Sequence, residues 1–376
     1  MNIVIISLNC FPYISPRSNR ATELAKEFSR QGHKVTLYAL LGDIDYTEFM
    51  NETKVTVKNL GTSKYGLVNN EEKKHTSKLV KGLTVLLKRP LHFPKIEAKS
   101  LTYNALKAEG HIDLLVTIAQ PHPIHWGAAK FREEYPNAIT TWIADCGDPF
   151  MLNPHFNNPW YFKYVEKKWC KLCDFITIPI EDGRKAYYPE FSSKIKIIPQ
   201  GFDFENNNLA QYTPNIRPTF GFAGLFYEKL RDPHAFLDYL CTLDSDFKFV
   251  IYIKDTPYFR SAFHLNEYKE KLGDKFEIRN FIPRAELLHE LSKMDFVINI
   301  RNVSTVQQPS KLIDYALSKR PILEITSDFK EQGTFEEFLN GNYTHQTIVE
   351  NIEQFNIKNV VNNMVALCQD FLKKTL

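Results

Sequence analysis

Arginine side chains and a predicted helix start occur together near the amino end of the chain. Arg17 and Arg20 flank that start, after a segment at 11–16 that two prolines stiffen. Ser18 or Asn19 can cap the helix, and its free N–H groups together with the guanidinium groups form a site for an anion. A capped surface turn with solvated arginines is the alternative. Two arginines at one helix start favour contact with a phosphate or a sugar.

Two carboxylates stand just beyond a predicted strand at 139–143. Asp145 and Asp148 are close enough in sequence to act as a pair, and such a pair can serve acid–base chemistry, orient sugar hydroxyls or bind a metal. The alternative is that they only cap the next segment. His122 follows the preceding predicted strand and is expected to face the same crevice, where packing and catalysis are equally compatible with its position.

A glycine turn and a basic pair follow a predicted strand at 219–223. Gly224 permits a close approach of the backbone to a ligand, and Lys229 or Arg231 could neutralise a diphosphate. The spacing differs from that of the phosphate loop of nucleoside triphosphatases, which ends in Lys followed by Ser or Thr. The sequence therefore predicts a diphosphate-binding turn of another kind.

The segment 307–323 carries a second phosphate-binding pattern. Pro309 and Ser310 open a predicted helix whose first N–H groups can hold a phosphate beside Lys311. Asp314 follows about one turn later, where a carboxylate can chelate ribose hydroxyls. Phosphate and ribose recognised together indicate a nucleotide. The alternative is an ordinary capped amphipathic helix with Asp314 in solvent.

The segments that must position these residues alternate between strand and helix. A strand over Ile3–Leu8, a helix over Thr22–Arg30 and a strand over Val35–Leu40 form a βαβ unit of a parallel sheet. The alternation continues to about residue 200, and it restarts at 219 after a polar, proline-containing stretch that is typical of a linker. Ligands of such sheets bind at the carboxyl ends of strands, where the candidate loops lie. The predicted fold class is α/β, with two doubly wound, Rossmann-like domains.

Length and composition agree with two soluble domains. A chain of 376 residues exceeds the usual size of one core. Hydrophobic residues make up 43% and charged residues 24%, which excludes disordered, collagen-like and coiled-coil chains. With 47 Lys and Arg against 44 Asp and Glu, the net charge is +3, too small for a protein that mainly holds nucleic acid. We expect no nucleic-acid partner.

Cysteine usage and hydropathy point to a cytoplasmic protein. The six cysteines are scattered, and Cys170 and Cys173 fit core packing in a helix better than metal or redox chemistry. No segment approaches the roughly 18 apolar residues of a membrane span, and the first residues read as a strand rather than a signal peptide.

The candidate segments together resemble those of a GT-B glycosyltransferase, and they are most similar to those of the large retaining family 4. The marks run in order along nearly the whole chain, at 11–20, 145–149, 197–203 and 309–315. The resemblance implies two Rossmann-like domains facing an interdomain cleft. The N-terminal one would hold the acceptor and the C-terminal one a nucleotide-diphosphate sugar. The predicted division is an N-terminal domain at 1–203, a linker at 204–218, a C-terminal domain at 219–355 and a last helix at 356–376 that packs back on the N-terminal domain.

The resemblance also assigns donor ligands by position. Asp314 stands where the family has the second Glu of a pair that binds ribose, whereas Val306 stands where the first Glu is expected. Gln307 or Gln308 would then contact the donor sugar. The whole implied donor-binding set is Gly224, Lys229, Arg231, Gln308, Ser310, Lys311 and Asp314.

The implied reaction displaces a nucleoside diphosphate, UDP or GDP, from an anomeric carbon. The acceptor would be a glycan or a lipid-linked glycan, as in the synthesis of bacterial surface polysaccharides, with retention of configuration and with no cofactor or metal. The implied catalytic residues are Asp145, Asp148 and His122, and Arg17 and Arg20 would contact the acceptor or a phosphate. Asp145 stands where many relatives have a histidine. The departure at Val306 keeps two alternatives open, a nucleotide-sugar 2-epimerase and a non-catalytic nucleotide-sugar-binding subunit.

A basic, partly amphipathic stretch lies at 73–99. Lysines and an arginine alternate there with leucines and valines, a pattern that suits a helix on an anionic membrane surface. A solvated helix packed on the N-terminal domain is the alternative. Membrane contact would make the protein peripheral on the inner face of the cell membrane and would fit a lipid-linked acceptor.

Overall fold

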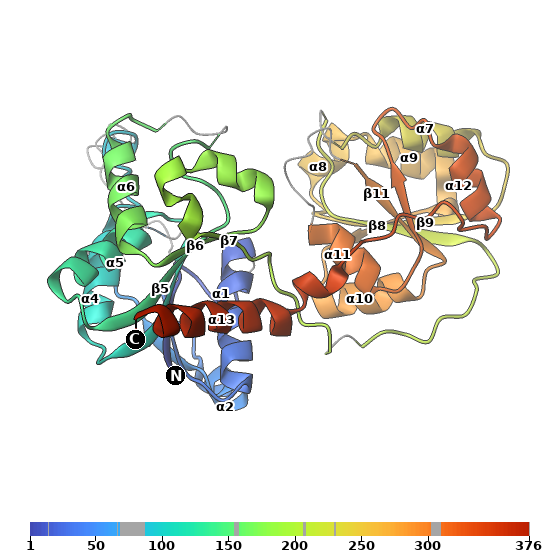
Figure 1. The fold of residues 1–376 in the computed structure, drawn as a ribbon. Coiled ribbons are helices and arrows are strands. Elements are labelled where there is room, and N and C mark those ends of the chain that lie inside the picture. Colours follow the sequence, from blue (N-terminus) through green and yellow to red (C-terminus); the bar gives the residue numbers. More distant parts are fainter. Residues whose placement is uncertain are drawn as a thin grey trace. The chain divides into compact units, whose positions relative to one another are not determined.

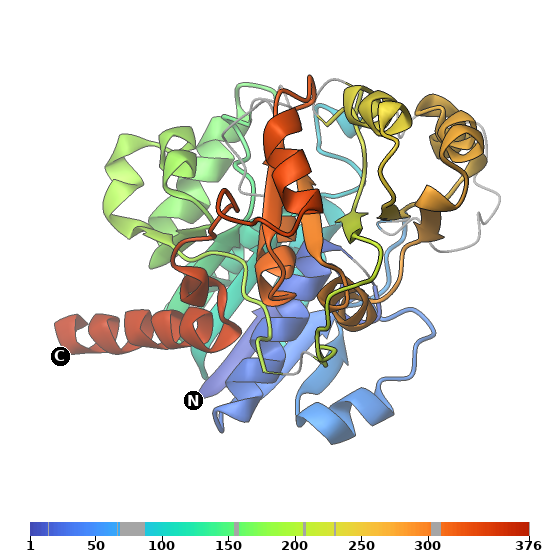
Figure 2. The same cartoon turned by 90° about the vertical axis from the view of Figure 1, so that its right-hand side faces the viewer.

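The computed structural model describes residues 1–13, 15–65, 67, 87–153, 158–205, 208–228, 231–301 and 310–375. Contacts divide the chain into two compact units, Met1–Phe202 with Gln354–Leu376, and Asp203–Glu353. Each unit is a sheet covered by helices (Figures 1 and 2). Of the predicted membrane segment at 73–99, residues 73–86 lie outside the described residues, and 87–99 are described.

The first unit contains a parallel sheet with the strand order β3-β2-β1-β4-β5-β6-β7. Alternate residues of β1 face opposite sides, so that Ile3 and Ile5 join one core cluster and Val4 and Ile6 the other. Burial on both faces explains why the strands read as unbroken apolar runs. The strands are β1 (Asn2–Ile6), β2 (Lys34–Ala39), β3 (Thr56–Asn59), β4 (Ile112–Ala119), β5 (Ile139–Cys146), β6 (Phe175–Ile178) and β7 (Ile195–Ile197).

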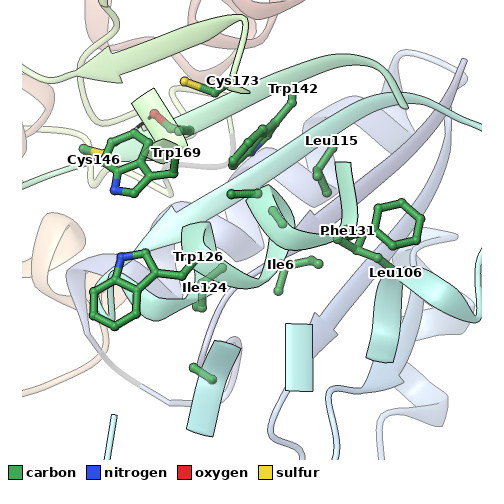
Figure 3. Close-up of a cluster of buried hydrophobic side chains, with 14 of the residues drawn as sticks. Ile6, Leu106, Leu115, Ile124, Trp126, Phe131, Trp142, Cys146, Trp169 and Cys173 are labelled. Carbon is green, nitrogen blue, oxygen red and sulfur yellow. Dashed lines mark hydrogen bonds between the residues drawn. The ribbon is translucent and has the colours of Figure 1, made fainter. Parts of the chain in front are cut away.

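Helices cover both faces of this sheet. On one face lie α4 (Glu97–Lys107), α5 (Pro123–Glu134) and α6 (Phe162–Leu172), and their core cluster includes the buried rings of Trp126, Trp142 and Trp169 shown in Figure 3. The opposite face carries α1 (Pro16–Arg30), α2 (Thr47–Thr53) and α13 (Ile357–Thr375). Two 3₁₀ segments, Glu181–Ala186 and Pro189–Lys194, join β6 to β7.

Helix α1 begins earlier than the predicted Thr22. Ser15 is the cap, because its side chain accepts a hydrogen bond from the Ser18 N–H at 3.1 Å. Pro16 suits the first helical position, where its missing N–H is not needed. The predicted caps, Ser18 and Asn19, are therefore wrong, since both lie inside the helix. Both arginines of the predicted anion site consequently belong to its first turns.

The last helix, α13, belongs to the first unit. It shares a core cluster with α1, in which Val360, Val361 and Met364 are fully buried with Leu24 and Phe28. Figure 2 shows α13 in red, ending at the carboxyl terminus. The carboxyl end of the chain therefore completes the core of the amino-terminal unit.

The second unit contains a parallel sheet with the order β10-β9-β8-β11-β12. The chain starts in the middle, at β8, and the order reverses between β8 and β11, which is where doubly wound sheets form a ligand crevice. The strands are β8 (Thr219–Ala223), β9 (Lys248–Ile253), β10 (Phe276–Asn280), β11 (Phe296–Ile300) and β12 (Ile322–Ile325).

The core of the second unit is rich in phenylalanine. The ring of Phe220 stacks on Phe296 at 4.8 Å and on Phe249 at 5.0 Å between centroids. One face carries α7 (His234–Thr242), α8 (Pro257–Ala262), α9 (Leu265–Leu272) and α12 (Gln332–Leu339). The other face carries α10 (Arg284–Ser292) and α11 (Ser310–Leu317). Short 3₁₀ turns at Gly273–Lys275 and Ile352–Phe355 complete the elements.

The segment predicted as a linker is bonded to the second unit over much of its length. Tyr212 donates its hydroxyl hydrogen to Asp295 at 2.7 Å, and the Asn215 N–H donates to the same carboxylate at 3.1 Å. The polar composition of this segment is thus used in side-chain hydrogen bonds. None of the helices among the described residues is both long and apolar enough to cross a membrane.

Candidate functional site

Gly224 directly follows strand β8, at the reversal point of the second sheet. Its φ of +134° lies in a region that favours glycine. A Cβ on this residue would lie 1.7 Å from the Nζ atom of Lys311. The absent side chain therefore makes room for the lysine, and α11 approaches β8 closely.

The described residues offer the amine of Lys311 no counter-ion. Its Nζ atom is buried, has no hydrogen-bond partner among the described residues, and lies 4.7 Å from the ring centroid of Phe222. Burial lowers the pKa of Lys311 to about 7, and the positive charge of Arg231 adds to this effect. An anion bound here would supply the missing partner.

Arg231 is the second cation of this site. Its guanidinium lies 5.2 Å from the ring of Tyr227, and its Nε is buried without a hydrogen-bond partner among the described residues. Burial lowers the pKa of Arg231, although Tyr227 and Tyr315 oppose the shift. Two desolvated cations near one glycine turn match a ligand with two phosphate groups.

A cavity of about 130 Å³ adjoins the lysine. Its walls are mostly apolar, which suits a flat ring, and the Asp314 carboxylate is at its edge. Burial raises the pKa of Asp314, and Arg284, whose Nε donates to the carboxylate at 2.7 Å, opposes that rise. The lining residues are Ala223, Gly224, Tyr252, Phe281, Ile282, Leu287, Lys311, Asp314 and Tyr315.

Tyr315 fixes helix α11 against β8. Its hydroxyl accepts a hydrogen bond from the Ala223 N–H at 2.9 Å and lies 3.2 Å from the Ala223 carbonyl. These two contacts hold α11 at the end of the strand. They therefore set the position of both Lys311 and Asp314.

Part of the predicted donor set meets at this cavity. Gly224, Lys311 and Asp314 line the cavity, and Arg231 is near enough for its charge to act on Lys311. Lys229 and Gln308 lie outside the described residues, and Ser310 begins α11 with its side chain undescribed.

Two parts of the site have no clear pattern in the sequence. One is the cavity wall at Phe281 and Ile282, which follows β10, and the other is Arg284, which begins α10. Their only sequence signal is an apolar pair and a proline directly after a predicted strand.

In the first unit, Asp145 pairs with Arg20. Arg20 Nη2 lies 2.9 Å from Oδ1 and Nε lies 3.2 Å from Oδ2, and the Thr177 hydroxyl donates to Oδ1 at 2.7 Å. Arg20 also donates to the carbonyls of Ile198 and Pro199. Burial acts to raise the pKa of Asp145, but Arg20 and Thr177 hold it below its usual value.

Two residues predicted for the reaction are thus partners of each other. Arg20 is 2% exposed and Asp145 is 3% exposed. Neither presents an open charge to a ligand, and together they join α1, β5, β6 and the chain after β7. Their geometry is that of positioning residues.

Arg17 and Asp148 lie at the surface instead. Their side chains are 26% and 43% exposed, with Nη2 and Oδ2 4.0 Å apart. The guanidinium of Arg17 covers Gly147, where a Cβ would lie 1.4 Å from Nη2. Of the predicted residues in the first unit, these are the two that a ligand can reach.

His122 is 2% exposed and packs against Phe150, with ring centroids 4.9 Å apart. Burial, with the nearby His125 and His92, lowers the pKa of His122 well below its usual value. The imidazole is therefore neutral and enclosed, and it does not contact solvent beside Asp148.

This architecture occurs in other proteins of known structure. No protein-family model matches the chain, and no curated protein matches its sequence. Solved structures match over nearly its full length. A glycosyltransferase from Rickettsia africae has a TM-score of 0.62 at 14% identity, covering 99% of each chain. Anabaena HepE in complex with UDP has a TM-score of 0.59 at 10% identity, covering 98% of this chain and 100% of its own.

The chain has the GT-B fold. The lipopolysaccharide outer core galactosyltransferase WaaB agrees, with a TM-score of 0.59 at 10% identity over 100% of both chains. The predicted fold is confirmed by these likenesses and by the two parallel sheets. The narrower resemblance to the retaining family 4 stays a prediction.

Proposed function

We propose that this GT-B protein is a glycosyltransferase that uses a nucleotide-diphosphate sugar as donor. The observation that carries the proposal is the desolvated pair of Lys311 and Arg231, without counter-ions among the described residues, beside a cavity edged by Asp314. HepE, which has the same fold, is described in complexes with UDP and with UDP-glucose. That likeness supports a nucleotide sugar as the donor here.

In the proposed complex each part of the donor meets a matching group. The nucleobase occupies the apolar cavity beside Phe281 and Ile282, and the Asp314 carboxylate accepts hydrogen bonds from the ribose. The diphosphate contacts Lys311, Arg231 and the first N–H groups of α11. UDP and GDP are the nucleotides that we expect.

The proposed reaction breaks the bond between the anomeric carbon and the diphosphate oxygen. The acceptor hydroxyl forms the new bond to that carbon, and its proton passes to the departing phosphate oxygen. Lys311 and Arg231 stabilise the charge that develops on the diphosphate. Attack from the front face would retain configuration, and the two cations would supply the charge that a metal supplies elsewhere.

We propose that the first unit contacts the acceptor through Arg17 and Asp148. Both are partly exposed beyond the carboxyl end of the first sheet. Arg17 can donate hydrogen bonds to sugar hydroxyls, and Asp148 can accept hydrogen bonds from them. The buried pair of Arg20 and Asp145 joins helix α1, which carries Arg17, to strand β5, which precedes Asp148. A glycan, free or lipid-linked, fits such a polar surface.

An exposed aromatic surface suits attachment to a membrane. Trp160 is 69% exposed and Tyr164 59%, their ring centroids are 6.1 Å apart, and Lys163 Nζ lies 5.0 Å from the Tyr164 ring. Tyr161 donates to the carbonyl of Pro90, beside the exposed Lys88, Arg89 and Leu91. Aromatic rings with nearby cations are the composition of a bilayer interface with anionic lipids.

We propose that this surface, Trp160 and Tyr164 with the turn at 88–91, rests on the anionic inner face of the cell membrane. Vesicles of phosphatidylglycerol and phosphatidylcholine should sediment the protein at low salt. Trp160→Ala with Tyr164→Ala should reduce binding at least roughly tenfold, because two interfacial rings are lost. Tyr258→Ala is the control, since Tyr258 is 81% exposed in the second unit. Equal binding by all three proteins would contradict the assignment.

The experiment for the transferase is acceptor-dependent release of UDP or GDP from a panel of nucleotide sugars. Turnover that requires an acceptor and falls in Asp314→Ala supports transfer. The alternative, a nucleotide-sugar 2-epimerase, is suggested by a structural likeness to a putative UDP-N-acetylglucosamine 2-epimerase from Listeria monocytogenes, with a TM-score of 0.54 at 9% identity. Sugar inversion at C2 without an acceptor would favour it. Binding without either activity would favour a nucleotide-sugar-binding subunit.

A further inference from the structure

Three metal-ligating side chains meet inside the first unit. They are His122, His125 and Cys146; all are buried, and their ligand atoms lie within 4.8 Å of one another. Strand pairing explains the meeting, because Ala119 at the end of β4 lies opposite Cys146 at the end of β5. The two histidines follow β4, at the start of α5. Residues far apart in sequence are thus brought to one point by the sheet.

The spacing between two of these ligands already suits a tetrahedral ion. His125 Nε2 lies 3.3 Å from Cys146 Sγ. An ion with bonds of about 2.0–2.1 Å to nitrogen and about 2.3 Å to sulfur holds such atoms roughly 3.5 Å apart. His122 reaches the same ion with a small side-chain rotation, since its distance to the other two atoms is within 4.8 Å.

A second layer of hydrogen bonds orients His125. Its Nδ1 lies 2.8 Å from the Thr117 hydroxyl, which also accepts the Trp142 indole N–H at 2.8 Å. A hydroxyl oxygen has two lone pairs, so it can accept from both rings. In the tautomer with the proton on Nδ1, which metal binding requires, the lone pair of Nε2 faces Cys146. Metal-bound histidines are commonly fixed by such a partner on the other nitrogen.

His122 supplies the independent sign of a missing ligand. It is 2% exposed, and neither ring nitrogen has a hydrogen-bond partner among the described residues. The backbone of Asp148 opposes in part the fall that burial causes in the pKa of His122. A buried polar atom without a partner costs free energy, so such an atom calls for an explanation. A bound cation gives one nitrogen that partner.

We propose that His122, His125 and Cys146 bind one borderline or soft cation, with Zn²⁺ the first choice. Two imidazoles and a thiolate select Zn²⁺ or Cu⁺ over Mg²⁺ and Ca²⁺, which prefer oxygen ligands. On binding, the S–H bond of Cys146 breaks, the sulfur–metal bond forms and the proton leaves to solvent. The ion would join the start of α5 to the end of β5. It plays no part in the proposed sugar transfer and is independent of it.

Cys173 provides a matched control. It is buried in the same core cluster, as Figure 3 shows together with Cys146 and Trp169. Each thiol is near a carbonyl, that of Cys170 at 3.5 Å and that of Ala144 at 3.8 Å, but only Cys146 belongs to the group of three ligands. Cys173→Ser therefore changes a neighbouring thiol without removing a proposed ligand. Cys146→Ser removes one.

The test is the metal content and the cobalt spectrum of the full-length protein. Protein from zinc-supplemented cultures should hold about one equivalent of zinc, as should Cys173→Ser, whereas Cys146→Ser should hold under a tenth as much. Protein from cobalt-supplemented cultures should show a thiolate-to-cobalt charge-transfer band in the near ultraviolet, absent from Cys146→Ser. If that variant fails to fold, His122→Ala should lower the zinc content of the protein at least tenfold.

The proposal fails on clear results. The proposed site would be overturned if the wild-type protein contained no zinc, both when purified from zinc-supplemented cultures and when refolded with an excess of zinc. A cobalt spectrum without the thiolate band would overturn it as well, and so would an identical band in Cys146→Ser. Loss of transferase activity has no bearing on these readouts.

Discussion

At the scale of single residues, two buried cations differ in what surrounds them. Arg20 is satisfied by Asp145 and by two backbone carbonyls. Lys311 Nζ has no acceptor within the described part of the chain, and burial lowers the pKa of Lys311 to about 7. The first cation therefore stabilises the fold, whereas the charge of the second is available to a ligand.

Lys311→Met should weaken the binding of UDP-glucose by roughly 10- to 100-fold, because a hydrogen bond to a charged phosphate is lost. The folded protein should be no less stable, since the variant removes a desolvated charge for which the described residues provide no partner. Isothermal titration calorimetry and urea unfolding measure the two effects. Lys271→Met, at an exposed lysine on α9, is the control. Unchanged affinity in Lys311→Met would exclude this residue from the donor site.

Binding of UDP-glucose should take up a proton. The free-state pKa of Lys311 is about 7, and a bound diphosphate favours the charged amine, so affinity should fall as the pH rises from about 6 to about 9. UDP-glucose is the suitable ligand because its diphosphate does not titrate in this range. Lys311→Arg, which stays charged, should show a flatter profile. Titrations in buffers of different ionisation enthalpy count the proton, and a pH-independent affinity would contradict the mechanism.

Asp145→Asn should destabilise the first unit by about 3–5 kcal/mol, because Arg20 is left buried without a full partner. The pKa of Asp145 is held below its usual value, so its contribution is present above the unfolded pKa and is lost as the pH falls through the folded one. Urea unfolding should therefore show that acidification below about pH 4 costs the wild type more stability than the variant. Equal acid sensitivity would show that the pair contributes little.

The sequence indicated each of these residues but not their pairing. Arg20 and Asp145 are 125 positions apart, and no local pattern records that an arginine in α1 reaches the end of β5. A surface anion site and a buried ion pair share the same residue types. Only the packing of α1 on the sheet decides between them.

At the scale of elements, strand β8 and helix α11 are held together by direct contacts. Tyr315 bonds to Ala223, and Lys311 lies over Gly224. Both elements were predictable, because a strand ending in glycine and a helix opening with proline and serine have clear sequence patterns. The cavity wall after β10 was not, since irregular loops carry no periodicity.

Gly224→Ala should lower the affinity for UDP-glucose and the stability together. Its φ of +134° disfavours alanine, and the added Cβ would collide with Lys311. Gly333→Ala is the matched control, because Gly333 lies in α12 with nothing within 4 Å of its Cβ position. That change should be neutral or stabilising by up to about 1 kcal/mol. Calorimetry and thermal unfolding separate the two variants, and equal behaviour would contradict the proposed role of the turn.

At the scale of the whole molecule, two parallel sheets repeat one plan. In each, the chain starts in the middle and the strand order reverses beside the first strand, next to β4 in one unit and β11 in the other. Alternating apolar and helical segments were enough to predict this plan. The residues proposed to bind the nucleotide all belong to the second unit, and the hydrophobic core of that unit is separate from the core of the first.

The central claim, that the second unit binds a nucleoside diphosphate through Lys311, is tested most directly by thermal unfolding with UDP, GDP, ADP and CMP. UDP or GDP should raise the unfolding temperature of the wild-type protein, since a ligand at about 100 times its Kd adds about 2.7 kcal/mol of stability. Lys311→Met should lose most of that rise. No shift with any nucleotide, or an equal shift in Lys311→Met, would contradict the account.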